Sequence, residues 1–320
     1  MTIEAVFKAG EHFRFAHGST LAETEAGLLC AWFAGRYESH PSTAIWASLR
    51  LPDGWSSPRK IIDHEGVALW NPVLHRRADG ELLLFYKAGE TPWSWSGRLS
   101  RSKDEGAHWS EPETLKGAPP PLGPIRSGPL ERPDGTLLCP SSREELADEE
   151  AGPWRAHIER FDPKSGAWSI GPVFGDPRRL NAIQPSLCDW GDGRILALCR
   201  TQSGAVGAAW SMDDGESWTD LDATTLPNPN SAVDVARIPE GPAILAHNPS
   251  AARRSPLLLS LSDDGSHWRP ALTLASGADE LAYPSLRLCA NGDIAVSWTK
   301  NYKEIMVARL AARDVIAKAS

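Results

Sequence analysis

Polar residues that could bind or transform a ligand recur at one position of the sequence, immediately before an apolar segment. This first set contains His17, Asn71, Arg126, Gln184, Asn230 and Tyr283. A second set follows the next apolar segment and includes Glu38, Lys87 and Arg200. Guanidinium, ammonium and amide groups donate hydrogen bonds and favour anions, so both sets suit an anionic, hydroxyl-rich ligand such as an acidic sugar. The alternative is that they only solvate the surface.

Three of these residues carry groups that can move protons or attack carbon. His17 is a general acid or base candidate because its pKa lies near neutral pH. Tyr283 is a candidate nucleophile or proton donor if a neighbouring cation lowers its pKa. Glu38 is a further acid/base candidate. The alternatives are a hydrogen-bonded histidine, a tyrosine that packs in the core or stacks on a ligand, and a solvated glutamate.

The segments that must position these residues form a repeat. A glycine followed by a mainly apolar run begins at Gly27, Gly80, Gly135, Gly193, Gly241 and Gly292, at intervals of 48 to 58 residues. A second series, in phase with the first, consists of Trp55, Trp109, Trp168, Trp218 and Trp268. A period near 50 residues with short strands and turn residues is typical of a β-propeller. We therefore expect one all-β domain over residues 1–320, with six blades.

The tryptophan series contains its own motif. Residues 102–109 and 211–218 both fit S-x-D-x-G-x-x-W, and residues 262–268 are a copy shortened by one residue. The motif is that of the Asp-box, a hairpin turn in which Ser and Asp bond the backbone, Gly takes a positive φ and Trp packs beneath. We expect structural roles for Asp104, Asp213 and Asp263. We also expect the N-terminal segment to pair with the last blade and close the ring, and residues 144–153 to form a surface loop.

Composition narrows the possible partners. The net charge of −8 argues against nucleic acid and anionic membranes, and the longest apolar runs fall short of the roughly 20 residues that span a bilayer. The N-terminus does not resemble a signal peptide, and the five cysteines have no CxxC spacing, so we expect buried thiols and a cytoplasmic protein. Neither a nucleotide-binding glycine loop nor a His/Cys cluster is evident, so we expect no cofactor and no metal.

The Asp-box turns, together with FRFAHGSTLAETEAGLLCAWFAGRYE near the N-terminus, resemble the sialidase (neuraminidase) superfamily. The resemblance is greatest to its bacterial branch of predicted neuraminidases with BNR repeats, and it covers nearly the whole chain. It implies a six-bladed propeller that removes a terminal sialic acid with retention. It also implies a tyrosine nucleophile assisted by a glutamate, an aspartate acid/base and three arginines that hold the sugar carboxylate.

Parts of that site match this sequence and parts differ. Tyr283 corresponds to the nucleophile, Arg200 to the second arginine, and Arg253 or Arg254 to the third. His17 stands at the position of the first arginine and Gln184 at that of the glutamate. The aspartate has no clear counterpart, and Glu38 and His40 are the nearest candidates.

Three functions remain open at this point. The first is a sialidase-like, exo-acting glycoside hydrolase that binds a terminal acidic sugar at the axis. The second is a lyase or hydrolase of a uronate-type sugar that uses a His/Tyr pair, and the third is a sugar-binding propeller without catalysis. Trp93 and Trp95 could form a stacking platform for a sugar, and His157 and Glu159 could point toward the mouth.

Overall fold

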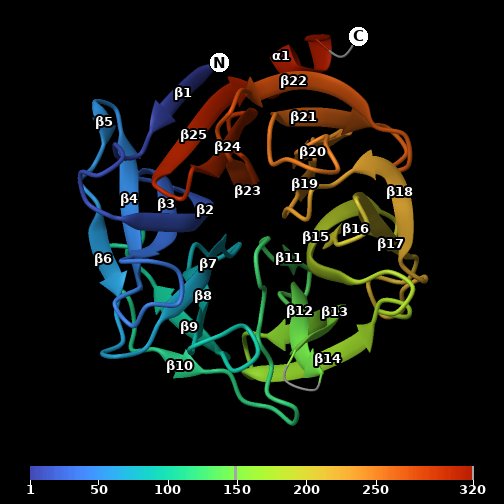
Figure 1. Ribbon diagram of the computed structural model, residues 1–320, viewed down its shortest axis with the longest axis horizontal. Coiled ribbons are helices and arrows are strands. Elements are labelled where there is room, and N and C mark those ends of the chain that lie inside the picture. Colours follow the sequence, from blue (N-terminus) through green and yellow to red (C-terminus); the bar gives the residue numbers. More distant parts are fainter. Residues whose placement is uncertain (148–149, 319–320) are drawn as a thin grey trace.

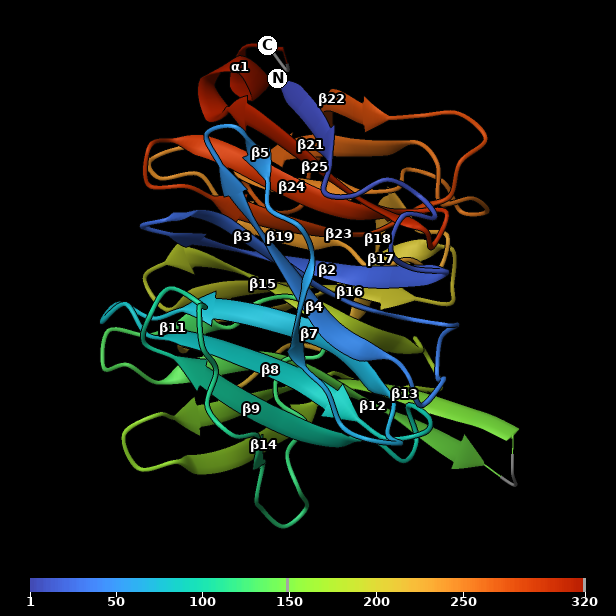
Figure 2. The same ribbon diagram turned by 90° about the vertical axis from the view of Figure 1, so that its left-hand side faces the viewer.

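The computed structural model describes residues 1–147 and 150–318. Its strands form antiparallel sheets that follow one another around a central axis, and strands such as β2 (Phe15–Thr24), β7 (Leu69–Arg76), β15 (Ala182–Gly191) and β23 (Leu281–Leu288) lie innermost (Figure 1). Seen from the side, the strands of neighbouring sheets run obliquely past one another (Figure 2). The predicted all-β fold is therefore confirmed for the described residues.

The first two sheets both begin at the axis and end at the outside. The first contains β2 (Phe15–Thr24), β3 (Gly27–Gly35), β4 (Ala44–Leu51), β5 (Gly54–Trp55) and β6 (Arg59–Ile62). The second contains β7 (Leu69–Arg76), β8 (Leu82–Ala88), β9 (Ser96–Ser102) and β10 (Glu113–Thr114).

Eight further strands are connected through one parallel pair, Arg155 with Ala182, which divides them into two groups of four. The first group is β11 (Leu130–Glu131), β12 (Leu137–Ala147), β13 (Glu150–Asp162) and β14 (Ala167–Val173). The second is β15 (Ala182–Gly191), β16 (Arg194–Thr201), β17 (Ala205–Ser211) and β18 (Asp222–Pro227).

The C-terminal third contributes two more sheets. One is β19 (Asp234–Arg237), β20 (Ala243–His247), β21 (Leu257–Ser262) and β22 (Arg269–Ala275). The other joins β23 (Leu281–Leu288), β24 (Asp293–Lys300) and β25 (Glu304–Ala311) to the N-terminal β1 (Thr2–Ala5). A short helix, α1 (Ala312–Lys318), follows β25. Strand β1 thus takes the place that the sequence assigned to the N-terminal segment.

The glycine series marks the turn into the second strand of each unit. Gly27 shows why the residue is needed, because its φ is 141° and a Cβ atom would lie 2.2 Å from the carbonyl oxygen of Arg50. A glycine of the series also precedes β8, β12, β16, β20 and β24, and each of these except Gly241 has a positive φ. The repeat that was read from the sequence is therefore a repeat of strand pairs.

The Ser-Asp-Gly-Trp turns have the predicted hydrogen bonds. Ser102 Oγ donates to Asp104 Oδ1 at 2.8 Å and accepts from the amide of Gly106 at 2.9 Å. In the shortened copy the carboxylate that accepts from Ser262 belongs to Asp264, and Asp263 instead pairs with Arg269. The turn-forming aspartate of this copy is therefore Asp264, because it lies two residues after the serine as in the complete copies, and Asp263 has a structural role of another kind.

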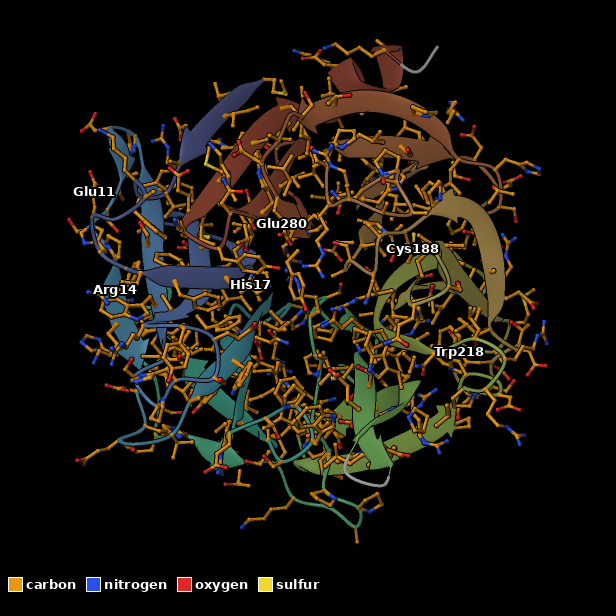
Figure 3. The ribbon with its side chains drawn as sticks, in the orientation of Figure 1. Glu11, Arg14, His17, Cys188, Trp218 and Glu280 are labelled. Atoms are coloured by element: carbon orange, nitrogen blue, oxygen red, sulfur yellow. The ribbon has the colours of Figure 1, made fainter. Side chains whose placement is uncertain are left out.

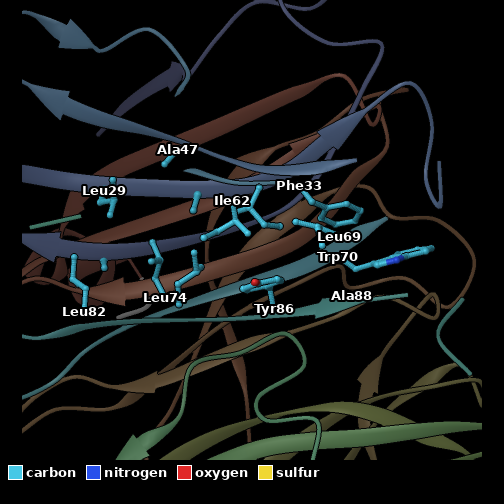
Figure 4. Close-up of a cluster of buried hydrophobic side chains, with 14 of the residues drawn as sticks. Leu29, Phe33, Ala47, Ile62, Leu69, Trp70, Leu74, Leu82, Tyr86 and Ala88 are labelled. Carbon is cyan, nitrogen blue, oxygen red and sulfur yellow. The ribbon is translucent and has the colours of Figure 1, made fainter. Parts of the chain in front are cut away.

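The core lies between neighbouring sheets. One cluster joins the first sheet to the second through Leu29, Phe33, Leu69, Leu84 and Tyr86 (Figure 4). The five tryptophans of the series pack against five different clusters, so each marks a separate contact between sheets. All five cysteines are free, and four of them are buried.

The segment 144–153 is not the predicted surface loop. Strand β12 continues to Ala147 and β13 begins at Glu150, and the pairing carries a bulge between Glu144 and Leu146. Residues 148–149 of this prediction lie outside the described residues. The acidic composition was interpreted as a loop, whereas a long two-stranded ribbon can also carry exposed acidic side chains.

Candidate functional site

Four of the innermost strands carry a bulge at the same place, close to the axis. The pairing register shifts after His17 in β2, Trp70 in β7, Ile183 in β15 and Ala282 in β23. The next residue has a positive φ in each strand, and these residues are Gly18, Asn71, Gln184 and Tyr283. A bulge re-aims a side chain and is common beside functional sites. The residue of β2 that is equivalent to Tyr283 is Gly18. The sequence analysis grouped His17 with Tyr283, and His17 lies one residue before the equivalent position.

The hydroxyl of Tyr283 is held by two donors from β15 and β16. Gln184 Nε2 donates at 3.0 Å, and Arg200 Nη1 donates at 2.9 Å. Arg200 is itself fixed by its Nε, which donates to Asn230 Oδ1 at 2.6 Å. No carboxylate bonds this hydroxyl among the residues that the structure describes. Both contacts favour a negative charge on the phenol oxygen.

The ring of His17 lies between two tyrosines at the axis. The ring centroids are 4.2 Å from Tyr283 and 4.7 Å from Tyr302, and His17 Nδ1 is 3.0 Å from Thr299 Oγ1. Burial lowers the pKa of His17 well below its usual value, and the charges of Arg254, Arg126 and Arg200 lower it further. The imidazole is therefore neutral at pH 7, the form that can accept a proton.

A third cation, Arg254, is fixed close to this group. Its Nη1 donates to Tyr302 Oη at 2.8 Å and to Glu280 Oε1 at 3.2 Å, and its Nη2 donates to the carbonyl of Asn230 at 2.8 Å. The Tyr302 hydroxyl donates to Glu280, and burial is the main cause of its raised pKa. Figure 3 shows His17 and Glu280 toward the centre of the molecule, whereas Glu11 and Trp218 lie far from it.

The structure distinguishes between the two adjacent arginines. The side chain of Arg254 is partly buried and directed at the cluster just described. Arg253 is exposed and donates to the carbonyl of Gly277 at 3.3 Å. Of the two predicted carboxylate-binding arginines, Arg254 is therefore the one that belongs to the cluster.

Arg126 does not have the position of a ligand-binding residue. It is only 2% exposed, and its guanidinium lies 5.3 Å from the centre of the Tyr283 ring. Its Nη2 donates to the carbonyl oxygens of Tyr283 and Pro284, while Nε and Nη1 are buried without a partner in the part of the chain that the structure describes. The prediction that Arg126 binds the ligand directly is therefore wrong, and Arg126 instead supports Tyr283.

Lys87 is also corrected, because it is fully buried between sheets. Its ammonium donates to the carbonyl of Pro124 at 2.9 Å, and burial lowers its pKa to about 7. Glu159, which was expected to point toward the mouth, is equally buried and accepts from the amides of Leu122 and Gly123 and from His157 Nε2. These groups satisfy one another inside the protein and leave no donor for a ligand.

Two glutamates lie at the rim of the cluster. Glu38 is exposed in the connection from β3 to β4, and Glu144 is half-buried on β12. The pKa of Glu38 is raised mainly because the surrounding protein limits hydration of the carboxylate, although the side chain keeps contact with solvent at the rim; Arg254 and Arg200 lower it, and Glu144 raises it again. The pKa of Glu144 is likewise raised by burial and lowered by Arg200. A carboxyl with a raised pKa keeps its proton to higher pH and can donate it.

Sequence reasoning did not assign roles to several residues of the cluster. Thr299 orients His17, and Glu280 joins Tyr302 to Arg254. Trp154 lies under the guanidinium of Arg200 at 5.2 Å. Tyr302 follows a second strand, as the second set of predicted residues does. Nothing in its spacing connects it with Glu280, because that contact depends on how two loops fold together. The remaining predicted residue, Asn71, is buried at its bulge in β7.

The opposite end of the inner strands holds a cavity of about 920 Å³. Its charges are compensated internally, as in the pairs His75–Glu131 and Arg132–Asp189. The described residues contain no group of three or more His, Cys, Asp or Glu that could hold a metal ion. Nor do they form a helix long and apolar enough to cross a membrane.

The comparisons agree with the repeat and the fold. The family model for the BNR repeat-like domain matches residues 26–296. The chain belongs to that family. No curated protein sequence matches this BNR repeat-like protein.

Three solved structures show the fold. The Hadza microbial sialidase Hz136 has a TM-score of 0.80 and 17% identity, over 98% of this chain and 69% of its own. A protein of unknown function from Dyadobacter fermentans has a TM-score of 0.79 and 16% identity, over 96% of this chain and 98% of its own. The K499G mutant of the NanB sialidase from Streptococcus pneumoniae has a TM-score of 0.77 and 11% identity, over 98% of this chain and 71% of its own. This BNR repeat-like protein therefore has a sialidase-like fold.

Proposed function

We propose that this protein is an exo-acting glycoside hydrolase of the sialidase type, which cleaves a terminal acidic sugar. The observation that carries the proposal is the Tyr283 hydroxyl, which accepts hydrogen bonds from Arg200 and Gln184 beside the neutral imidazole of His17. The sialidase names of two of the structural neighbours support the same class of substrate.

The carboxylate of the sugar would bind Arg200 and Arg254. Both guanidinium groups are fixed on Asn230, one by its side chain and the other by its backbone carbonyl. Two converging guanidinium groups present paired N–H donors to a planar carboxylate. The side-chain amides of Asn71 and Gln184 are of a type that can hydrogen-bond sugar hydroxyls.

In the proposed reaction, Tyr283 Oη attacks the anomeric carbon and the bond to the leaving oxygen breaks. His17 takes the phenol proton, and Glu38 protonates the leaving oxygen. Water then breaks the bond between Tyr283 and the sugar, giving its proton to Glu38 and its hydroxyl to the anomeric carbon. The proton on His17 returns to Tyr283, so the enzyme is regenerated and the configuration is retained.

Turnover of a fluorogenic sialoside tests this proposal. We expect release of the fluorophore by the purified protein, loss of that release in Tyr283→Phe, and a large decrease in Glu38→Gln. Met212→Ala, at an exposed turn, is the matched control. An absence of turnover over a broad pH range, in protein shown to be folded, would overturn the sialidase version.

A second candidate is elimination from a uronate-type sugar. It is favoured by one observation, namely that Tyr283 has Gln184 where the sialidase resemblance implies a glutamate. A neutral His17 would take the proton α to the sugar carboxylate, and Tyr283 would protonate the leaving oxygen. The unsaturated product absorbs ultraviolet light, so an increase in absorbance distinguishes elimination from hydrolysis. Saturable binding of acidic glycans without either product would indicate a binding protein.

We also propose that residues 1–320 form one domain of six blades. The support is the division of the eight connected strands at the pair Arg155–Ala182 and the pairing of β1 with β25. An experimental structure in which the N-terminal segment pairs elsewhere would contradict this arrangement.

A further inference from the structure

A groove beside Arg200 has no part in the reaction described above. It has a volume of about 460 Å³ and is lined by Pro92, Trp93, Trp95, Leu122, Arg143, Glu144, Glu145 and Leu146. We call it the Trp93 groove. Its walls come from the connection between β8 and β9 and from the ribbon of β12 and β13.

The floor of the Trp93 groove is an exposed aromatic surface on a fixed support. Trp93 is 44% exposed, which is unusual for so large an apolar side chain. Trp95 packs edge-on against Trp70 with 5.8 Å between centroids, and Trp70 Nε1 donates to the carbonyl of Gly89 at 2.8 Å. The indole of Trp93 is therefore presented by a loop that is anchored to the core at both Gly89 and Trp95.

Glu144 and Trp154 connect the Trp93 groove to the proposed active site. Glu144 lines the groove and is paired across the ribbon with Trp154. The Arg200 guanidinium lies 5.2 Å from the centre of the Trp154 ring, and Arg200 donates to the Tyr283 hydroxyl at 2.9 Å. A ligand whose acidic sugar binds Arg200 would therefore extend its next unit toward Trp93.

The charges of the groove favour a neutral unit. Glu145 is neutralised by Arg155, with Oε1 and Nε 2.7 Å apart. This leaves Arg143 and Glu144, whose charges oppose one another, whereas Arg200 in the proposed active site bonds only neutral partners among the described residues. Without excess positive charge, the groove offers a second acidic sugar no attraction, whereas aromatic and polar surfaces together suit the apolar face and hydroxyls of a neutral pyranose.

We infer that the Trp93 groove binds the neutral sugar on the leaving-group side of the scissile bond, with that sugar stacked on Trp93. The assignment to the leaving-group side rests on the proposed function. Binding of a neutral disaccharide in the groove does not, so the two can be tested separately.

Two substrates with the same acidic sugar test the leaving-group assignment. We expect Trp93→Ala to lower kcat/KM for sialyllactose by about tenfold and to leave kcat/KM for the methyl sialoside within about twofold. Trp93→Phe keeps a ring and should retain most activity on sialyllactose, and Met212→Ala should match the unmodified protein on both substrates. Equal losses on the two substrates would overturn the assignment.

Binding of lactose alone provides the second measurement. We expect saturation-transfer NMR to detect contact between lactose and the protein, with the signal lost in Trp93→Ala and kept in Trp93→Phe and Met212→Ala. Lactose binding without turnover of any sialoside would uphold the groove and reject the proposed hydrolase. A lactose signal that is absent, or that Trp93→Ala leaves unchanged, would overturn the groove itself.

Discussion

Arg126 supports Tyr283 in two ways, because its guanidinium bonds the Tyr283 backbone and also faces the Tyr283 ring. Arg126 Nη2 donates to the carbonyl oxygens of Tyr283 and Pro284, the latter at 2.8 Å. These carbonyls flank the bulge at which Tyr283 takes a φ of 56°, a conformation that costs a non-glycine residue free energy. One buried cation therefore holds the strained backbone and also lies 5.3 Å from the ring whose oxygen would become negative.

Arg126→Met should impair Tyr283 more than it impairs the fold. Loss of the buried cation should make negative charge on the Tyr283 oxygen less favourable, because an opposite charge beside the ring is removed. We expect kcat to decrease by about a hundredfold on any substrate that the protein turns over. Ultraviolet difference titration against Tyr283→Phe measures the phenol pKa directly.

Arg126→Lys separates charge from geometry. Lysine keeps the cation but cannot reproduce the planar guanidinium that bonds two carbonyls, so we expect partial activity. If both variants shift the melting temperature but leave the phenol titration unchanged, Arg126 has a structural role alone.

Gln184→Glu places a carboxylate against the Tyr283 hydroxyl, 3.0 Å from the present amide nitrogen. The new negative charge should oppose the negative charge that develops on the Tyr283 oxygen. It should also pair with Arg200, which already donates to the Gln184 carbonyl oxygen at 3.3 Å. We therefore expect KM for an acidic sugar to increase by roughly tenfold.

A steady-state comparison with Gln184→Ala provides the control for that prediction. Alanine removes the amide without adding charge, so it should affect KM less than glutamate does. An unchanged or lower KM in Gln184→Glu would show that Arg200 does not bind the substrate carboxylate.

The strand repeat could be predicted because it depends on local chemistry that recurs. Gly27 and four of its five counterparts have a positive φ, and Trp109 and Trp218 fill gaps between sheets, so each leaves a residue type at a fixed interval. The exchange of Asp263 for Asp264 shows the limit of this approach. A motif that loses one residue does not reveal which of two adjacent aspartates makes the turn.

The convergence of the inner strands on the axis could be predicted, because it follows from the repeat. The depth at which each side chain lies along the axis could not be predicted from the repeat. Arg126 and Lys87 were taken for ligand-binding residues because they are cationic and correctly placed in sequence, yet both side chains are buried. Likewise, the shift from His17 to Gly18 depends on a bulge whose register is visible only once β2 and β3 are paired.

Ser211→Ala should destabilise the fold and leave activity unchanged. Ser211 is buried, accepts from the amide of Gly215 at 2.7 Å and donates to Asp213 at 2.8 Å. Alanine leaves that amide without a partner, at a cost of about 1–3 kcal/mol in the free energy of unfolding. Urea denaturation measures the change, with Met212→Ala in the same turn as the control. A change below about 0.5 kcal/mol would mean that water replaces the hydroxyl.

His247 should make stability depend on pH below neutrality. It is buried on β20, its Nε2 lies 2.9 Å from Ser260 Oγ, and burial lowers its pKa to about 4. Between pH 6.5 and about 4 the unfolded chain therefore binds a proton that the folded protein does not. The contribution of His247 is fully present above pH 6.5 and decreases as the pH falls, by about 3 kcal/mol over the whole interval. Urea denaturation at several pH values should show a flatter dependence for His247→Gln, which has no titrating ring. A slope equal to that of the unmodified protein would assign the acid sensitivity to other groups, of which His17 and His75 also have lowered pKa values.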